Sequence, residues 1–137
     1  ASIFKSFMSK VLKRSNCRFF LMTGNNIDEL KIMDEIIESE YKEYCTPLNN
    51  FTIKEILPII PNCQIAICND SSFSHLSAGL GIKTIVLMVD TPLIYGSYNK
   101  NMYPILPEGE TNVTHDTLGK DKINPEEIYN NFKKLLG

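Results

Sequence analysis

The chain lacks several features that mark common protein classes. Its 14 Lys and Arg are balanced by 16 Asp and Glu, and no dense basic run occurs, so the electrostatic footprint of a nucleic-acid-binding protein is missing. No apolar run approaches the roughly 20 residues that a membrane-spanning helix needs, and the first residues do not resemble a signal peptide. We therefore expect a cytoplasmic protein that has no nucleic-acid partner and no transmembrane segment.

Sequence motifs of several enzyme classes are also absent. No two cysteines have the CxxC spacing of a zinc or redox site, and we expect no metal site. The cysteines instead fit the role of small, reduced core residues: Cys17, Cys45, Cys63 and Cys68. The GxSxG of serine hydrolases, the phosphate loop of nucleotide triphosphatases and the GxGxxG of dinucleotide-binding proteins do not occur.

The remaining pattern alternates apolar strands with amphipathic helices. Strands are predicted at 17–24, 64–69 and 83–90, with shorter extended pieces at 45–48 and 102–106. Helices are predicted at 1–12, 28–44, 52–61, 72–80 and 124–136, and Asp28 is the expected cap of the second. Because the main strands are apolar throughout, the sheet should be mostly parallel and covered on both faces. The predicted fold class is α/β, a three-layer Rossmann-like domain.

The length of the chain fits one ordinary domain. The sequence opens inside an amphipathic helical pattern that has no cap. We therefore interpret residues 1–137 as a single domain that forms part of a longer protein.

A short polar segment, Asn69-Asp70-Ser71-Ser72, lies between two of the predicted strands, and His75 follows it in the next helix. In an open parallel sheet, ligands bind at the carboxyl ends of the strands, and Gly24 and Thr91 lie at two other such ends. The amino end of the helix would offer free backbone N–H groups to a phosphate or diphosphate. His75 could add a hydrogen bond or a charge, and Asp70 would suit a sugar hydroxyl.

Each of these residues also has a purely structural interpretation. Asp70-Ser71 is the composition of an Asx turn or a helix cap, and a lone histidine is more often packed or solvated than functional. Gly24 would need only an unusual backbone angle. The case for a site depends on their coincidence at one edge of the sheet.

The segment NFTIKEILPIIPNCQIAICNDSSFSHLSAGLGIKTIVLMVDT resembles the carboxyl-terminal half of glycosyltransferase family 9, the ADP-heptose:lipopolysaccharide heptosyltransferases. The resemblance rests on Asp70-Ser71-Ser72, the spacing to His75, the Ala78-containing helix and Thr91 in the loop after the next strand, and it covers about residues 17 to 95. The family usually has glycine where Ser72 stands. It often has an acidic ribose partner in the loop occupied here by Asn25 and Asn26.

The resemblance implies a GT-B architecture, in which this chain is the donor-binding half and a missing amino-terminal domain supplies the catalytic base. It implies an inverting, metal-independent glycosyltransferase that needs no cofactor, acts at the inner face of the membrane, and is inactive as this half alone. A nucleotide-diphosphate sugar such as ADP-heptose would be the donor, and a lipopolysaccharide or other glycan the acceptor. The implied donor-binding residues are Gly24, Asn25, Asn26 and Leu48 near the nucleoside, Asp70 at the sugar, Ser71, Ser72 and His75 at the diphosphate, and Thr91.

Two other hypotheses remain open at the level of the sequence. One is a non-catalytic flavodoxin-like or receiver-like ligand-binding module, although a receiver would need acidic residues where Gly24-Asn25-Asn26 stands. The other is a domain that folds without binding a ligand.

Overall fold

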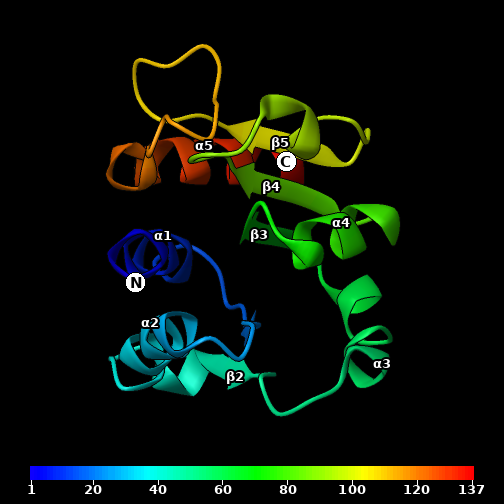
Figure 1. Cartoon of the computed structure of the whole chain (residues 1–137). Coiled ribbons are helices and arrows are strands. Elements are labelled where there is room, and N and C mark those ends of the chain that lie inside the picture. Colours follow the sequence, from blue (N-terminus) through cyan, green and yellow to red (C-terminus); the bar gives the residue numbers. More distant parts are fainter. The chain divides into compact units, whose positions relative to one another are not determined.

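The computed structural model describes residues 1–119 and 121–137, and Figure 1 shows the arrangement of its helices and strands. The chain divides into two compact units, Ala1–Leu57 and Pro58–Gly137, which are described separately below. The α-helices and strands follow one another in the predicted order, and every strand pair is parallel. The α/β, Rossmann-like fold class is confirmed, with the strands arranged in two small sheets.

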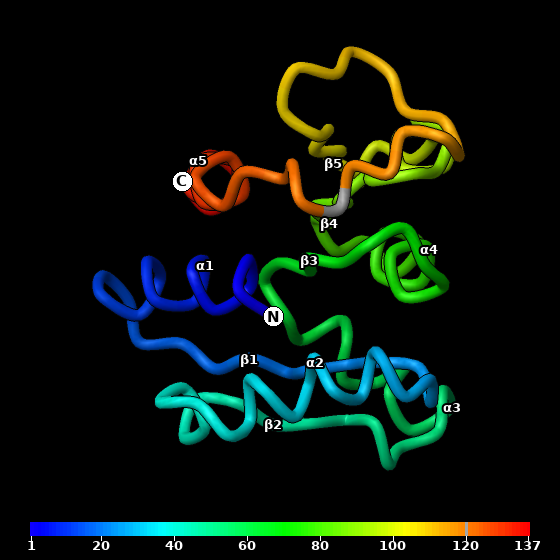
Figure 2. Tube along the Cα trace, turned by 60° about the vertical axis from the view of Figure 1, so that its left-hand side comes forward, coloured from blue at the N-terminus to red at the C-terminus, as the bar shows by residue number. Residues whose placement is uncertain are grey.

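The first unit contains three helices and one two-stranded sheet. Its elements are α1 (Ser2–Leu12), β1 (Phe19–Leu21), α2 (Ile27–Ile37), the 3-10 turn η1 (Lys42–Tyr44), β2 (Cys45–Pro47) and α3 (Ile53–Ile56). Strand β1 pairs with β2 in parallel, with Phe19 opposite Cys45, and α2 packs against β2 (Figure 2). The apolar spacing of α1 produces a buried face at Phe7, Met8 and Val11.

The bounds of α2 differ from the prediction at both ends. Asn26, and not Asp28, is the cap: its Oδ1 accepts the Asp28 N–H at 2.8 Å. The predicted helix to residue 44 stops at Ile37, because the Ser39 hydroxyl donates to the Ile36 carbonyl at 2.6 Å and accepts the Tyr41 N–H at 3.2 Å. Serine side chains compete with helical hydrogen bonds in this way, and the helix ends there.

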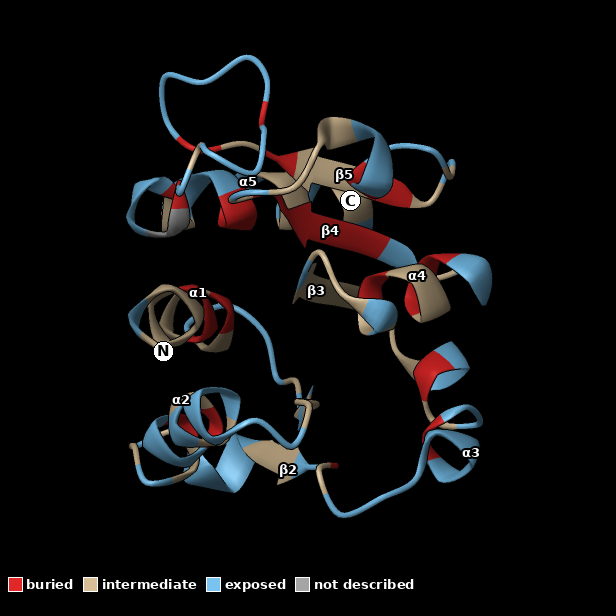
Figure 3. Cartoon of the chain, viewed as in Figure 1, coloured by how far each residue is buried: buried red, intermediate tan, exposed pale blue. Residues whose placement is uncertain are grey.

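The second unit is built on a three-stranded parallel sheet. Its elements are η2 (Ile60–Asn62), β3 (Ile65–Asn69), α4 (Ser72–Gly79), β4 (Lys83–Leu87), η3 (Leu93–Gly96), β5 (Met102–Ile105), η4 (Lys120–Lys122) and α5 (Pro125–Leu136). Strand β4 lies in the middle of the order β3-β4-β5, and Figure 3 shows that almost all of it is buried. Helices α4 and α5 pack on opposite sides of it (Figures 1 and 2).

The register of this sheet brings the ends of its strands to one edge. Asn69 at the end of β3 lies opposite Leu87 of β4, and Leu87 lies opposite Ile105 of β5. The turn into α4 and the segment after β4 therefore emerge side by side. This is the edge at which open parallel sheets bind ligands.

Candidate functional site

Hydrogen bonds between Ser71 and Ser74 hold the turn from β3 into α4. Ser71 is the N-cap residue, in extended conformation. The Ser74 hydroxyl accepts the Ser71 N–H at 3.2 Å and donates to the Ser71 carbonyl at 2.7 Å. The Ser74 N–H donates to the same carbonyl at 3.1 Å. Ser74 is therefore not among the free N–H groups that the sequence predicted at the amino end of this helix. The N–H groups of Ser72 and Phe73 have no partner among the described residues.

The Asp70 carboxylate lies beside the first turn of α4. Its side chain is 12 % exposed, and its Oδ1 is buried with no hydrogen-bond partner among the residues that the structure describes. The His75 ring lies beside it, with Nε2 3.4 Å from Asp70 Oδ1. This distance permits an ion pair but exceeds that of a good hydrogen bond. The two residues are thus brought together as predicted for one edge of the sheet.

The other ring nitrogen of His75 is held by Tyr98. Nδ1 lies 2.6 Å from the Tyr98 hydroxyl, and the two rings are nearly parallel, with centroids 5.6 Å apart and an interplanar angle of 18°. Asp70, His75 and Tyr98 therefore form a continuous row of polar contacts that joins the end of β3, α4 and the segment after η3.

Sequence reasoning missed Tyr98, because no periodicity or motif links it to His75, which lies 23 residues earlier. The sequence carries no signal that could have found this contact, and only the structure shows that apolar and aromatic residues of this segment are exposed. Ile94, Tyr95 and Tyr98 are 61 %, 50 % and 56 % exposed.

The thiol of Cys68 lies just before this site in β3. Burial, together with the neighbouring Asp70 carboxylate, raises the pKa of Cys68 to about 12. A thiol with so high a pKa stays protonated at neutral pH and is a poor nucleophile. Cys68 therefore contributes to the packing of β3, which is a structural role of the kind that the sequence favours for the cysteines.

In the first unit, the loop after β1 holds three of the predicted residues. The N–H of Gly24 donates to Glu29 Oε2 at 2.6 Å, and a Cβ at Gly24 would lie 2.9 Å from the same oxygen. Asn25 is exposed, and Asn26 caps α2. Glu29 is a second residue that sequence reasoning missed: it stands three residues after the cap Asn26, the position at which an acidic side chain folds back over the turn.

The remaining two predicted site residues are Leu48 and Thr91. Leu48 is 2 % exposed, and its N–H donates to the Leu21 carbonyl at 2.8 Å, so its observed contacts are those of a core residue of the first unit. Thr91 follows β4 in the second unit and is partly exposed. Gly24, Asn25, Asn26 and Leu48 belong to one unit, and Asp70, Ser71, Ser72, His75 and Thr91 to the other.

A comparison with protein-family models decides the family. Residues 5–122 match the model of glycosyltransferase family 9 (heptosyltransferase). The chain belongs to this family. The match covers most of the chain and includes every residue predicted for the site. Neither a search of curated proteins nor a search of solved structures returned a significant match.

Membership of glycosyltransferase family 9 supports a glycosyltransferase function with a sugar donor and an acceptor, and a GT-B fold. Within residues 1–119 and 121–137, no cluster of three His, Cys, Asp or Glu side chains is placed to bind a metal ion. No helix in the described part of this family 9 chain is both long and apolar enough to cross a bilayer.

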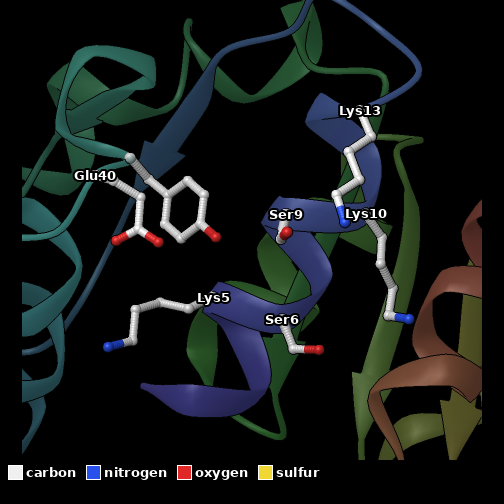
Figure 4. Close-up of a pocket in the computed structure, with 7 residues that line it drawn as sticks. Lys5, Ser6, Ser9, Lys10, Lys13 and Glu40 are labelled. Carbon is white, nitrogen blue, oxygen red and sulfur yellow. The ribbon is translucent and has the colours of Figure 1, made fainter.

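The first unit of the family 9 chain also carries a groove of about 390 Å³ along α1. Its lining residues are Lys5, Ser6, Ser9, Lys10, Lys13, Glu40 and Tyr41. Figure 4 shows that the Lys5 and Lys10 side chains point in opposite directions, so their positive charges do not converge. The groove includes none of the predicted site residues.

Proposed function

We propose that this family 9 chain is the carboxyl-terminal, donor-binding domain of a heptosyltransferase-like enzyme with two Rossmann-like domains. Its donor is a nucleotide-diphosphate sugar, and ADP-heptose is the first candidate. The acceptor is a lipopolysaccharide or another glycan at the inner face of the membrane. The family match supports the transferase class, and the second unit carries the residues that we propose for the sugar and the diphosphate of the donor.

The proposal rests mainly on one observation, which is the juxtaposition of Asp70, His75 and the amino end of α4. The N–H groups of Ser72 and Phe73 have no partner among the described residues, and the helix dipole places partial positive charge there. A diphosphate at this end would accept both N–H groups and a hydrogen bond from His75. Ser71 and Ser72 would add hydroxyl contacts.

Asp70 suits a neutral donor group better than a phosphate. Its Oδ1 is a buried acceptor with no hydrogen-bond partner among the described residues, and leaving such an atom unpaired costs about 1–3 kcal/mol. A sugar hydroxyl of the donor would supply the missing proton. Thr91, after the neighbouring strand, is proposed to contact the donor from the same edge.

The loop after β1 is proposed to border the nucleoside. Gly24, Asn25 and Asn26 form this loop, and Leu48 is proposed to lie beside the base. Glu29 restores the acidic group that the loop sequence lacks, because its carboxylate reaches back to the Gly24 N–H at 2.6 Å. A carboxylate here could accept hydrogen bonds from both ribose hydroxyls.

The proposed reaction is an inverting displacement without a metal ion. An acceptor hydroxyl attacks the anomeric carbon on the face opposite the nucleotide, the bond from that carbon to the phosphate oxygen breaks, and the acceptor proton passes to a base in the amino-terminal domain. The α4 amino end and His75 stabilise the charge that develops on the leaving diphosphate. Without the other domain the acceptor is not aligned, so this chain alone is proposed to bind the donor and transfer nothing.

A titration tests the proposal. ADP, UDP and GDP are added to the protein while the amide signals of Ser72, Phe73 and His75 are followed by NMR. One of the three nucleotides should shift these signals. His75→Ala should weaken its binding about tenfold, the value of one charge-assisted hydrogen bond, and should lower turnover of the full-length enzyme. His115→Ala is the matched control and should change neither.

Two results would contradict the proposed function. If no diphosphate shifts the Ser72 and Phe73 signals, the α4 end is not a phosphate site, and the non-catalytic module becomes the better hypothesis. If His75→Ala leaves the turnover of the full-length enzyme unchanged, His75 does not stabilise the leaving group.

A further inference from the structure

Tyr98 makes a contact with His75 that lies outside the polar segment from Asn69 to His75. The Tyr98 hydroxyl lies 2.6 Å from His75 Nδ1, which is a short and well-formed hydrogen-bond distance. The near-parallel rings add a second restraint on the same side chain. Without them, an imidazole that is 39 % exposed would sample several rotamers.

The direction of this hydrogen bond follows from Asp70. An ionised carboxylate can only accept, and Asp70 Oδ1 faces Nε2 at 3.4 Å. In the neutral ring the proton is therefore favoured on Nε2, and Nδ1 accepts the proton of the Tyr98 hydroxyl. Asp70 and Tyr98 are the titratable groups in contact with His75 among the described residues.

The hydrogen bond between His75 Nδ1 and the Tyr98 hydroxyl can also form when the imidazole is protonated. An imidazolium donates from both nitrogens, and a phenol oxygen can accept as well as donate. When His75 gains a proton, the Tyr98 hydroxyl only has to rotate for Nδ1–H to donate to it. The ring can thus change its charge next to a diphosphate without changing its position.

We propose that Tyr98 is a positioning residue for His75: it binds Nδ1 in both charge states and leaves Nε2–H as the one ring donor that can reach a phosphate oxygen of the donor. Because the Asp70 contact of 3.4 Å is longer than a good hydrogen bond, it does not saturate Nε2–H, and a phosphate oxygen beside Asp70 could accept from the same N–H while the ring stays in place. This inference rests on the proposed binding of a diphosphate near His75.

The first test does not involve the donor. Histidine is labelled with ¹⁵N in the protein, where His115 provides an internal reference within the chain. In the wild type, the Nδ1 signal of His75 should be that of an unprotonated, hydrogen-bonded nitrogen. Tyr98→Phe keeps the stacked ring and removes the hydroxyl, so the Nδ1 signal should move toward that of a free nitrogen. Tyr95→Phe is the matched control and should leave it in place.

The second test measures binding of the nucleoside diphosphate identified by the titration above. Tyr98→Phe should weaken its affinity about twofold to tenfold, the value of one net hydrogen bond, and Tyr95→Phe should not. The double variant His75→Ala, Tyr98→Phe should bind no more weakly than His75→Ala alone, because Tyr98 acts through His75. Independent, additive losses would overturn the proposal.

The outcomes separate this inference from the proposed function. If the wild type binds no diphosphate, the proposed function fails, while the ¹⁵N signals still report whether Tyr98 holds Nδ1. If the wild type binds and His75→Ala weakens it, but Tyr98→Phe changes neither the Nδ1 signal nor the affinity, Tyr98 is not a positioning residue. Tighter binding by Tyr98→Phe would mean that Tyr98 competes with the donor, which also contradicts the proposal.

Discussion

Gly96 is a residue of the second unit that leaves little room for a side chain. It is buried at the end of η3, two residues before Tyr98. A Cβ built at Gly96 would fall on Sδ of Met88 and lie 3.3 Å from both Cγ and Cε of the same residue. Met88 directly follows β4, is 0 % exposed and belongs to a cluster of buried core residues. Gly96→Ala must therefore displace either the methionine or η3.

The expected cost can be estimated from overpacking. Inserting one methyl group into a filled core costs about 1–3 kcal/mol. The control is the same substitution at Gly79, the last residue of α4, where an added Cβ has nothing within 4 Å and the site is exposed. Alanine is a better helix former than glycine, so Gly79→Ala should leave the stability unchanged or raise it by up to about 1 kcal/mol.

Urea unfolding of the three proteins measures the difference. Gly96→Ala should lower the unfolding midpoint with an unchanged slope, and Gly79→Ala should not lower it. The ¹⁵N signal of His75 Nδ1 gives a second readout, because a displaced η3 would carry Tyr98 away from His75. The reasoning is refuted if Gly96→Ala unfolds at the same urea concentration as the wild type, or if both alanine variants are equally destabilised.

Two further predictions concern Cys68 and Asn124. In the folded protein at pH 8, iodoacetamide should modify Cys68 last of the four cysteines, as followed by mass spectrometry, because its pKa is raised to about 12. Since the raised pKa lies above the ordinary value of 9.0, the folded state keeps this proton longer, and stability should fall as the pH rises from about 9 to 12. Cys68→Ala should make this decline smaller. Asn124 caps α5 by accepting the Glu126 N–H at 2.9 Å, so Asn124→Ala should lower the unfolding free energy by about 1 kcal/mol, measured in urea. Equal stability of wild type and Asn124→Ala would show that this cap is dispensable.

The fold was predictable because its signals are local. The apolar run at β4 predicted a buried central strand, and Asn124-Pro125 predicted the start of α5. Gly81 adopts a φ of +87°, which is the backbone conformation expected of a glycine that stops a helix. Hydrophobic periodicity and capping chemistry act over a few residues, and they can be read without knowing the tertiary structure.

The site was predictable only in part, for the same reason. The Asp70–His75 contact follows from their spacing, because both lie at the start of α4. Tyr98 and Glu29 could not be placed in this way. Tyr98 lies 23 residues after His75, so their contact depends on how two separate elements pack, which no local pattern encodes. Glu29 reaches Gly24 because Asn26, and not Asp28, caps α2, which sets the direction of the first turn.

The charges at the proposed diphosphate site nearly cancel before a ligand arrives. When protonated, His75 is offset by Asp70 at 3.4 Å, which leaves mainly the partial charge of about +0.5 at the α4 amino end. A free diphosphate brings repulsion from Asp70 as well as attraction to His75. In the proposed complex, an intact sugar donor would place a hydroxyl on Asp70, which would convert the repelling group into a hydrogen-bond partner. On this proposal the Asp70–His75 pair would favour the complete donor over its diphosphate product, and this difference would assist release of the nucleotide after transfer.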